Sequence, residues 1–455
     1  MPISHVFIAN RGEIAVRIIR ACRAAGLECV IGVSAADRES FGAELADRAV
    51  VLGPAPARES YLNLPLIVHA AKATGCDALH PGYGFLSERA ELAALCEKNG
   101  IAFVGPRPET IELLGDKLRA REMAEQAGLA RVPGSAALAD ASEARQAARE
   151  IGYPVVMKAS AGGGGRGMFV ARDPESIECS FKRASAEALA AFGDGTLYME
   201  SYVENARHVE VQVMGDGEGR VVHFGARDCS VQRRYQKVIE EAPATALSAK
   251  SHDKVLELAL SLAAHLDYRN AGTVEFLYDM ARDALYFIEV NARIQVEHPV
   301  SEEISGRDLV CEQLRIAAGD GLSVTQGDIK LAGHAIECRI NAEDPFNGFT
   351  PSPGRIARWQ PPEGVDVRLD SHCRDGDLVA PFYDSLIGKL IVRGADRPSA
   401  IEGMRRALQE FEIGGIASNL ALQRGILAHP DFAANKFNTR WLESAFLPQF
   451  ESAEG

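Results

Sequence analysis

The chain has 455 residues, of which 47% are hydrophobic and 25% are charged. These fractions are typical of a globular protein, and they exclude a disordered, collagen-like or coiled-coil chain. The net charge of −14, without a long basic run, argues against a duplex-DNA binder. At about 150 residues per domain, the length predicts about three domains or two large ones.

The sequence contains no segment that points to a membrane or to an oxidising compartment. No stretch of about 18 apolar residues occurs, and the N-terminus leads directly into a strand-like pattern without a signal segment. The 9 cysteines are scattered, odd in number and never spaced as C-x-x-C. This pattern predicts buried free thiols rather than disulfides or a zinc site. We therefore expect a cytoplasmic protein with no membrane and no nucleic-acid partner.

The first 105 or so residues alternate strand-like and helix-like segments. The apolar runs 6–9, 29–33, 78–80 and 101–104 are separated by helical patterns that include 13–25 and 88–98. Such a βαβ series predicts a parallel sheet with helices on both faces.

The rest of the chain mixes the two kinds of segment without an internal repeat or a low-complexity linker. Its patterns predict helices at 108–150, 248–266, 307–318 and 398–410, strands at 154–158, 168–170 and within 197–241, and a β-hairpin at 273–291. Between 331 and 445, short strands alternate with turns that contain proline and glycine. We expect the parts to pack as one compact body.

Four consecutive glycines lie in the segment 162–167, between two predicted strands. Glycines let a backbone approach a ligand closely with its amides pointing inward. With Lys158 just before it, the segment predicts a hinged phosphate cover, although a bare glycine run is equally typical of a flexible surface turn. Neither a Walker A loop nor a G-x-G-x-x-G opening of the first βα unit occurs.

The hairpin at 273–291 carries candidate metal ligands. If a loop at about 280–284 closes symmetrically, Leu277 faces Phe287 and Glu275 faces Glu289 directly across the ladder. Two opposed carboxylates are unfavourable unless a cation lies between them.

Asn291 and Arg293 follow on the face of Glu289, because alternate residues of a strand share a face. Two carboxylates and an amide oxygen suit Mg²⁺. The alternative is a solvent-facing strand with incidental acids, which the apolar residues on the Glu275 face disfavour.

Residues 293–299 bring a cation, an amide, a carboxylate and an imidazole together just after the hairpin. Arg293 could hold an anion while Glu297 acts as a general base, although Glu297 could instead be a charge at a helix N-terminus. His298, which precedes a proline, is expected to be structural.

The segment 227–237 carries four cationic residues. Such a run is usually a solvated face, but within a strand-rich region it could line an anion pocket. No hydrolase signature is present, and no cysteine has an obviously activating setting.

With these segments together the chain resembles the ATP-grasp superfamily and, more narrowly, the biotin carboxylases. The segments that carry the resemblance are 9–13, 80–88, 158–168, 293–299, 334–344 and 383–389. The resemblance implies an α/β and α+β architecture in three parts. These are a Rossmann-like N-terminal domain (1–114), an ATP-grasp domain (115–330) with a mobile lid at about 132–203, and a C-terminal mixed α/β domain (331–446).

The activity that the resemblance implies is carboxylation of biotin by bicarbonate through carboxyphosphate, with ATP and Mg²⁺ or Mn²⁺. Biotin would arrive on a lysine of a biotin carboxyl carrier protein, and a carboxyltransferase would choose the final acceptor, such as an acyl-CoA or pyruvate. Both partners are expected on other chains or other parts of a longer one, because no Ala-Met-Lys-Met motif follows the last domain. A homodimer is also expected.

The resemblance also implies site residues, motif by motif. ATP would be held by Lys117, Lys158, Gly164, Gly165, Glu200, Val203, His208 and, at a position where many members have histidine, Tyr235. The metal would be held by Glu275, Glu289 and Asn291. Bicarbonate would be held by Lys237, Arg293, Gln295 and the Val296 backbone. Glu297 would be the general base, Arg339 would stabilise the biotin anion, and Tyr83 would contact biotin.

Two residues depart from the family pattern, and two other functions stay open. Tyr235 leaves one nucleotide contact in doubt, and Asn270 stands where a glycine is common. One alternative is an ATP-grasp ligase that forms an acyl phosphate on a different carboxylate. The other is a catalytically silent nucleotide-binding module, which the presence of acid, base and metal positions disfavours.

Overall fold

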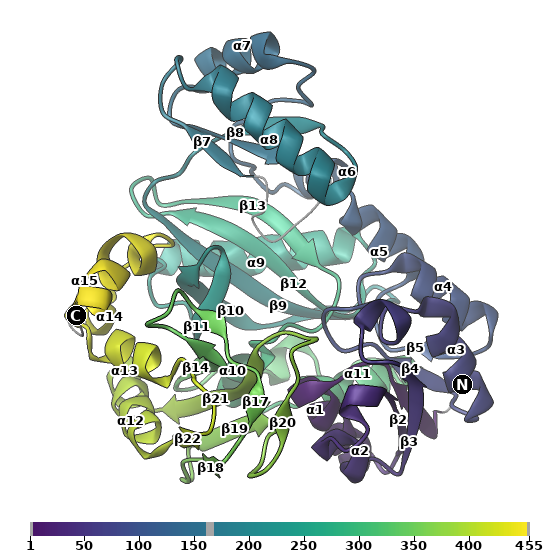
Figure 1. Cartoon of the computed structure of the whole chain (residues 1–455). Coiled ribbons are helices and arrows are strands. Elements are labelled where there is room, and N and C mark those ends of the chain that lie inside the picture. Colours follow the sequence, from purple (N-terminus) through teal and green to yellow (C-terminus); the bar gives the residue numbers. More distant parts are fainter. Residues whose placement is uncertain (1–2, 161–167, 453–455) are drawn as a thin grey trace.

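The computed structural model describes residues 3–160 and 168–452 of the chain (Figure 1). The glycine-rich segment, including Gly164 and Gly165, lies outside the described residues. None of the described helices is both long and apolar enough to cross a membrane.

The N-terminal part is a five-stranded sheet in the order β3-β2-β1-β4-β5, and all of its strands pair in parallel, as predicted. Its strands are β1 (His5–Ile8), β2 (Glu28–Ser34), β3 (Arg48–Gly53), β4 (Ala78–His80) and β5 (Ala102–Phe103). Its helices are α1 (Gly12–Ala24), α2 (Phe41–Leu45), α3 (Leu64–Ala73), α4 (Ala90–Lys98) and α5 (Pro108–Gly115). Val6 and Ile8 enter one apolar core and Phe7 enters another, so both faces of β1 are covered. The sequence pattern did not reveal β3.

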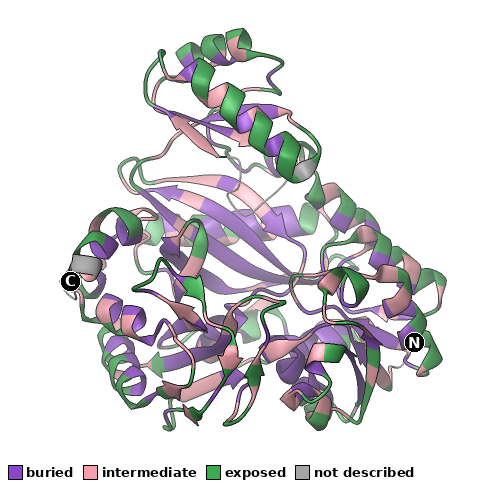
Figure 2. Cartoon of the chain, viewed as in Figure 1, coloured by how far each residue is buried: buried purple, intermediate pink, exposed green. Residues whose placement is uncertain are grey.

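The middle of the molecule is an eight-stranded antiparallel sheet in the order β13-β12-β9-β10-β11-β14-β21-β19. Its strands are β9 (Ala206–Asp216), β10 (Val221–Arg233), β11 (Gln236–Ala242), β12 (Arg269–Asp279), β13 (Ala284–Asn291), β14 (His334–Asn341), β19 (Val367–Ser371) and β21 (Leu386–Gly394). The helices beside it are α9 (Ala249–His265), α10 (His298–Ser305) and α11 (Leu309–Ala318). Figure 2 shows that most of this sheet is buried.

A smaller lobe stands above the central sheet in Figure 1. It has its own three-stranded sheet, in which β6 (Val155–Ala159) lies between β7 (Phe169–Ala171) and β8 (Leu197–Ser201). Two helices cover this sheet, α7 (Ala141–Ile151) and α8 (Ile177–Phe192), and α6 (Lys117–Gln126) leads into the lobe. Its core is separate from the others, which fits a part that can move as a unit.

The C-terminal part packs its helices against the far end of the central sheet. They are α12 (Arg397–Glu410), α13 (Leu420–Ala428), α14 (Pro430–Ala433) and α15 (Leu447–Ser452). Short strand pairs form the turns around them: β15 (Glu343–Asp344) with β16 (Thr350–Pro351), β17 (Gly354–Arg355) with β20 (Leu378–Val379), and β18 (Arg358–Gln360) with β22 (Glu412–Gly414). The central sheet continues from β11 into β14, so one ladder joins this part to the middle of the molecule.

The structure accounts for two features of the sequence. All nine cysteines are free; seven are buried as predicted, whereas Cys179 is exposed and Cys311 is partly exposed. Asn270 adopts a left-handed backbone with φ of 70°, which explains why glycine also suits this position. Its amide exchanges hydrogen bonds with Gln313, so the asparagine also ties β12 to α11.

Candidate active site

One cavity of about 1410 Å³ opens between the small lobe, the central sheet and loops of both terminal parts. Of the predicted site residues that the structure describes, all but Glu297 line it: Tyr83, Lys117, Lys158, Glu200, Val203, His208, Tyr235, Lys237, Glu275, Glu289, Asn291, Arg293, Gln295, Val296 and Arg339. Residues more than 250 positions apart in the sequence therefore meet at one site.

The hairpin brings Glu275 directly opposite Glu289, as predicted. The second predicted pair was wrong, because Leu277 faces Tyr286 rather than Phe287. The loop between β12 and β13 covers residues 280–283, one residue fewer than the predicted loop 280–284, which moves the pairing by one. A bulge between Phe287 and Glu289 then adds one residue and restores the register at the two carboxylates.

The two carboxylates and Asn291 fit a divalent metal. Asn291 Nδ2 lies 2.9 Å from Glu275 Oε1, and Lys117 Nζ lies 3.7 Å from Glu289 Oε2. Burial, together with the nearby charge of Glu275, raises the pKa of Glu289. Two opposed carboxylates suit Mg²⁺, and a bound cation would relieve their repulsion. Asn291 would join them as a ligand through its oxygen, which in this structure accepts from Arg293 while the amide nitrogen faces Glu275.

Lys237, on β11, lies at the centre of three buried carboxylates. Its ammonium lies 3.0 Å from Glu275 Oε1 and 2.6 Å from Glu297 Oε1, and it also contacts Glu210. Burial opposes the charge, but the three carboxylates outweigh it and raise the pKa of Lys237 well above its ordinary value. Lys237 thus places one positive charge against both Glu275, a predicted metal ligand, and Glu297, the candidate base.

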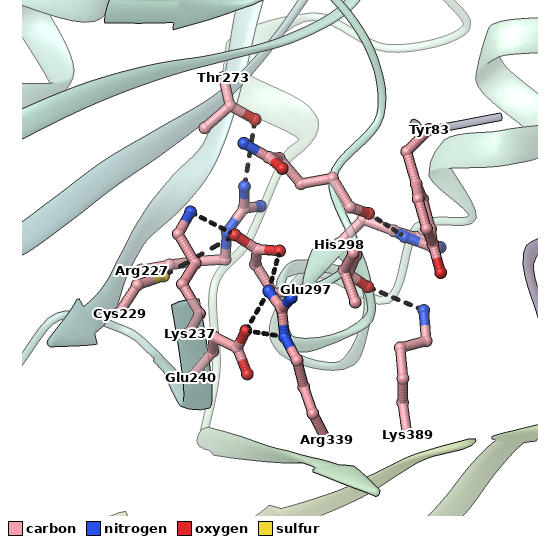
Figure 3. Close-up of polar contacts among 12 residues, drawn as sticks. Tyr83, Arg227, Cys229, Lys237, Glu240, Thr273, Glu297, His298, Arg339 and Lys389 are labelled. Atoms are coloured by element: carbon pink, nitrogen blue, oxygen red, sulfur yellow. Dashed lines mark hydrogen bonds and ion pairs between the residues drawn. The ribbon is translucent and has the colours of Figure 1, made fainter. Parts of the chain in front are cut away.

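Glu297 is fully buried behind Lys237 and Arg339, which is why it does not line the cavity (Figure 3). Arg339 Nη2 donates to Glu297 Oε2 at 3.0 Å. Burial works against the ionised form, but Lys237 and Arg339 outweigh it and lower the pKa of Glu297. Glu297 also lies at the N-cap of α10, as the alternative interpretation requires, yet its side chain makes no capping hydrogen bond.

Arg293 and Gln295 form a cradle beside the metal ligands. Arg293 donates to Gln295 Oε1 at 2.6 Å, to Asn291 Oδ1 at 3.0 Å and to Glu88 Oε2 at 3.0 Å. Arg293 lies beyond the end of β13, so strand alternation does not place it, but its guanidinium still meets Asn291. Three partners fix the planar group in one orientation, which suits recognition of a small planar anion.

A second charged group lies on the side of the cavity formed by the small lobe. Lys158 and Arg121 both contact Glu200 on β8, and Arg121 Nη2 lies 2.8 Å from Glu200 Oε1. Burial opposes charge on Lys158, but Glu200 outweighs it and raises its pKa. Val203 follows β8 on the cavity wall.

His208 contacts Glu275, one of the predicted metal ligands. Its Nε2 is 3.2 Å from Glu275 Oε2. Burial opposes protonation, but Glu275 outweighs it and raises the pKa of His208 to about 9. His208 is therefore charged at neutral pH and balances part of the carboxylate cluster.

Tyr235 lies in the two-residue turn between β10 and β11 and is half-exposed to the cavity. Both Arg234 and Tyr235 have positive φ, 49° and 64°, in a turn that usually takes asparagine and glycine. Among the described residues, no hydrogen-bond partner of the Tyr235 hydroxyl is found.

Part of the basic segment 227–237 is a solvated face and part of it lines the cavity, so each of the two interpretations holds for some of its residues. Arg234 is exposed, as on a solvated face, whereas Lys237 enters the cavity wall. Arg227 is fully buried, and its Nε donates to Glu210 Oε1 at 2.6 Å. Cys229 Sγ lies 4.0 Å from Glu297 Oε1, but burial raises the pKa of the thiol well above its ordinary value, so it stays protonated.

Sequence reasoning missed two buried acids, Glu210 and Glu240, one exposed acid, Glu88, and one buried cation, Arg121. Glu240 accepts from Arg339 Nε at 2.6 Å and keeps that guanidinium aligned. Burial raises the pKa of Glu240 to about 7. The polar residues His208, Glu210 and Gln212 alternate along β9, and this period of two in a buried strand is the signal that could have indicated Glu210.

Three family profiles cover nearly all of the chain. Residues 2–111 match "Biotin carboxylase, N-terminal domain", residues 116–325 match "Carbamoyl-phosphate synthase L chain, ATP binding domain", and residues 337–444 match "Biotin carboxylase C-terminal domain". The biotin carboxylase of Pseudomonas aeruginosa is 50% identical over 440 residues, which are 96% of this chain and 97% of that protein.

Two solved structures extend the comparison. The biotin carboxylase domain dimer of Hydrogenobacter thermophilus 2-oxoglutarate carboxylase, in complex with MgADP, ADP and bicarbonate, has a TM-score of 0.94 and 45% identity over 99% of both chains. Rhizobium etli pyruvate carboxylase has a TM-score of 0.93 and 41% identity over 99% of this chain and 41% of that chain. The chain thus belongs to the biotin carboxylase family, whose ATP-dependent ligases carboxylate biotin with bicarbonate.

Proposed function

We propose a division of roles among the cavity residues for the first half-reaction of a biotin-dependent carboxylase. The observation that carries the proposal is the position of Lys237, which contacts both the metal-side Glu275 and the buried base Glu297. A group bound beside Lys237 can therefore reach the nucleotide phosphates and the base at the same time.

The phosphate side of the cavity neutralises charge. Lys117 and Lys158 would hold the ATP phosphates, and Glu275, Glu289 and Asn291 would hold Mg²⁺ or Mn²⁺. When bound, the metal would offset the negative charge of the transferred phosphoryl group. Phosphoryl transfer needs alignment and charge neutralisation more than covalent catalysis, so these residues suffice.

The bicarbonate side aligns the nucleophile. Arg293, Gln295, Lys237 and the Val296 backbone would bind bicarbonate, and Glu297 would take its proton as its oxygen attacks the γ-phosphorus and ADP leaves. In the structure Glu297 is a weak base, because Lys237 and Arg339 lower its pKa. An anion that engages Lys237 would weaken that ion pair, so the buried Glu297 becomes more basic only when substrate is present.

The carboxyphosphate formed in this way would break down to CO₂ and phosphate. Phosphate would then take the N1′ proton of biotin, and the biotin anion would attack CO₂. Arg339 would stabilise that anion, and Tyr83, which also lines the cavity, would contact the biotin ring. Glu240 holds Arg339 in place for this role.

The small lobe would act as a lid over about 132–203. Its separate sheet and core support this role, and Lys158 and Glu200 would travel with it. Closure would keep water from the labile carboxyphosphate. We propose the domain boundaries 1–114, 115–330 and 331–446 on the same grounds, with the central sheet shared by the last two parts.

A biotin carrier and a carboxyltransferase complete the reaction cycle, because this half-reaction only loads biotin. We propose a homodimer, which the dimeric H. thermophilus domain supports at 45% identity. A reducing compartment such as the cytoplasm suits nine free thiols. Native mass spectrometry of the purified chain would give the oligomeric state directly.

The central test is ATP hydrolysis in saturating Mg·ATP. Free biotin should stimulate a bicarbonate-dependent release of phosphate, and no stimulation would overturn the proposed half-reaction. Glu297→Ala should lose the bicarbonate-dependent rate by at least about 100-fold while ATP still binds. Full turnover of this variant would remove Glu297 from its role as the base.

A further inference from the structure

Lys389 is a fully buried lysine to which the roles above assign nothing. It lies on β21 with no exposed side-chain surface. Its Nζ donates to the Val296 carbonyl oxygen at 2.8 Å and lies 3.2 Å from Glu13 Oε1 and 3.9 Å from Asp370 Oδ2. A buried ammonium is costly unless it is paired and hydrogen-bonded, so these contacts are specific features of the fold.

The Val296 carbonyl belongs to the peptide that joins Val296 to Glu297. Because the peptide unit is planar, a donor that fixes this carbonyl also fixes the amide of Glu297 and the direction in which its side chain leaves. The preceding carbonyl, of Gln295, is held in the same way by His298 Nδ1 at 2.8 Å. Two successive peptides beside the cavity are therefore held, one by the first residue of α10 and the other by Lys389 on β21 of the central sheet.

Lys389 and Arg339 are direct partners in the β14–β21 ladder. Figure 3 shows both side chains extending from this ladder toward Glu297. Arg339 holds the Glu297 carboxylate, and Lys389 holds the backbone just before it. Two cations directly opposite each other repel, so the acids around them have to offset this repulsion.

Those acids come from different parts of the chain. Glu13 lies in the first turn of α1, where the helix N-terminus favours a negative charge. The same Glu13 oxygen accepts a hydrogen bond from the hydroxyl of Tyr83, which lines the cavity. Asp370, on β19, is held by Arg368. Lys389 thus contacts Glu13 of the N-terminal part and Asp370 of the C-terminal part, and it also holds the backbone carbonyl directly before Glu297.

We propose that Lys389 is a positioning residue of this reaction, which sets the Val296–Glu297 peptide and so aims the Glu297 carboxylate at bound bicarbonate. The proposal rests on the roles proposed above for Val296 and Glu297. Lys389 itself would touch neither substrate. Its effect would be specific to bicarbonate, because the nucleotide contacts lie on other strands.

The first test is Lys389→Met, which keeps the length of the side chain and removes the donor. We expect KM for bicarbonate to rise about 10-fold and kcat to fall about 10-fold, because a displacement of about 1 Å at a reacting group costs up to about 100-fold. KM for Mg·ATP should stay within about 2-fold. If Lys389 only stabilised the fold, the substitution would change KM for bicarbonate and KM for Mg·ATP together, or would change neither.

The matched control is Arg397→Met. Arg397 is also paired with a buried acid of the central sheet, with 2.7 and 2.9 Å to the two oxygens of Glu241, and its side chain is only 10% exposed; no hydrogen bond or ion pair joins it to residues 293–297. It should lose stability and leave KM for bicarbonate unchanged. If Lys389→Met behaves like Arg397→Met, the positioning role is overturned.

A second variant separates loss of charge balance from loss of positioning. Glu13→Gln combined with Lys389→Met removes one charge of each sign and leaves the Val296 carbonyl without its donor. The raised KM for bicarbonate should persist in this double variant. A return to the wild-type value, or failure of both variants to fold as judged by circular dichroism and ADP binding, would overturn the proposal and make Lys389 a purely structural residue.

The failure of the proposed function would look different. If Glu297→Ala keeps its full bicarbonate-dependent turnover, the assignment of the base fails, whatever Lys389→Met does. If Glu297→Ala is inactive and Lys389→Met has an unchanged KM for bicarbonate, only the positioning role fails.

Discussion

The ammonium of Lys237 lies 2.6 Å from Glu297 Oε1, in a pocket where the carboxylate has no exposed surface. If bicarbonate binds beside Lys237 as proposed, this pair would control both how tightly bicarbonate is held and how basic Glu297 is when bicarbonate arrives.

Lys237→Met should be the most damaging single change on the bicarbonate side. It leaves Glu210, Glu275 and Glu297 buried without their shared cation, and breaking one partner of a buried ion pair costs about 3–5 kcal/mol. We expect a loss of bicarbonate-dependent turnover of about 100-fold or more, measured as phosphate release. Lys254→Met, which breaks an exposed pair with Glu257, is the control and should change neither rate nor stability. Turnover within about 3-fold of wild type in Lys237→Met would contradict the role assigned to this lysine.

Glu289→Gln should not lower the stability of the metal-free protein, but it should weaken the effect of Mg²⁺. Burial and the nearby Glu275 disfavour the ionised form of Glu289, as its raised pKa shows. Removing the charge should therefore leave the metal-free protein at least as stable as wild type. In Mg²⁺ the same variant should need about 10-fold more metal for half-maximal ATP hydrolysis, because one ligand is weaker. Thermal unfolding with EDTA and with Mg²⁺ checks the sign, and an unchanged Mg²⁺ requirement would count against this ligand.

Glu241 gives a pH-dependent contribution to stability away from the cavity. Burial opposes its charge, but hydrogen bonds from His334 and Arg397 outweigh burial and lower its pKa from 4.5 to about 2. An acid with a lowered folded-state pKa stabilises the fold above its unfolded pKa, and the stabilisation is lost as pH falls through the folded value. Glu241→Gln should therefore cost on the order of 3 kcal/mol at pH 7.

The difference between wild type and Glu241→Gln should shrink as the pH is lowered from about 5 toward about 2, in urea unfolding followed by fluorescence. Glu412→Gln, which breaks an exposed pair with Arg358, should show no such trend. A difference that is constant over this pH range would mean that Glu241 is not ionised in the fold.

Tyr235→Gly should separate stability from nucleotide binding. Tyr235 has a φ of 64°, and a left-handed residue with a side chain costs about 1 kcal/mol that glycine does not. The variant should be more resistant to thermal unfolding by about that amount. KM for Mg·ATP should rise modestly, because the half-exposed ring is part of the cavity wall. Tyr235→Phe is the companion variant, and a changed KM in it would show that the hydroxyl contacts the nucleotide.

The local patterns of the sequence predicted most of the elements and part of the site. The parallel N-terminal sheet, the hairpin and the helices at 248–266 and 398–410 follow from periodicity, and α9 and α12 match them closely. The opposed carboxylates could be placed on one hairpin from the sequence, but their exact pairing was predicted correctly only because the bulge compensates for a loop one residue shorter than expected. The paired positions of Leu277 could not be predicted, since a one-residue change in the loop and a bulge have no clear sequence signal.

The residues that sequence reasoning missed act through long-range contacts. Glu210, Glu240 and Lys389 lie on three different strands of the central sheet, and their partners come from segments tens to hundreds of residues away. Glu240 and Lys389 look like ordinary charged residues in a strand until the sheet order is known, and only Glu210 has a local signal, the alternation along β9. Family resemblance suggested the roles of Lys237 and Arg339, and the geometry shows which buried carboxylates hold these two cations.

The four-residue loop between β12 and β13 and the bulge between Phe287 and Glu289 compensate for each other. Lengthening the loop alone, or removing the bulge alone, would shift one strand past the other by one position. A strand shifted by one residue turns every side chain to the opposite face. Insertions in the turn are therefore not neutral for this protein, although the turn itself is on the surface. A one-residue insertion there should be tolerated only together with removal of the bulge, and libraries that vary the two places jointly should yield active hairpins that neither change yields alone.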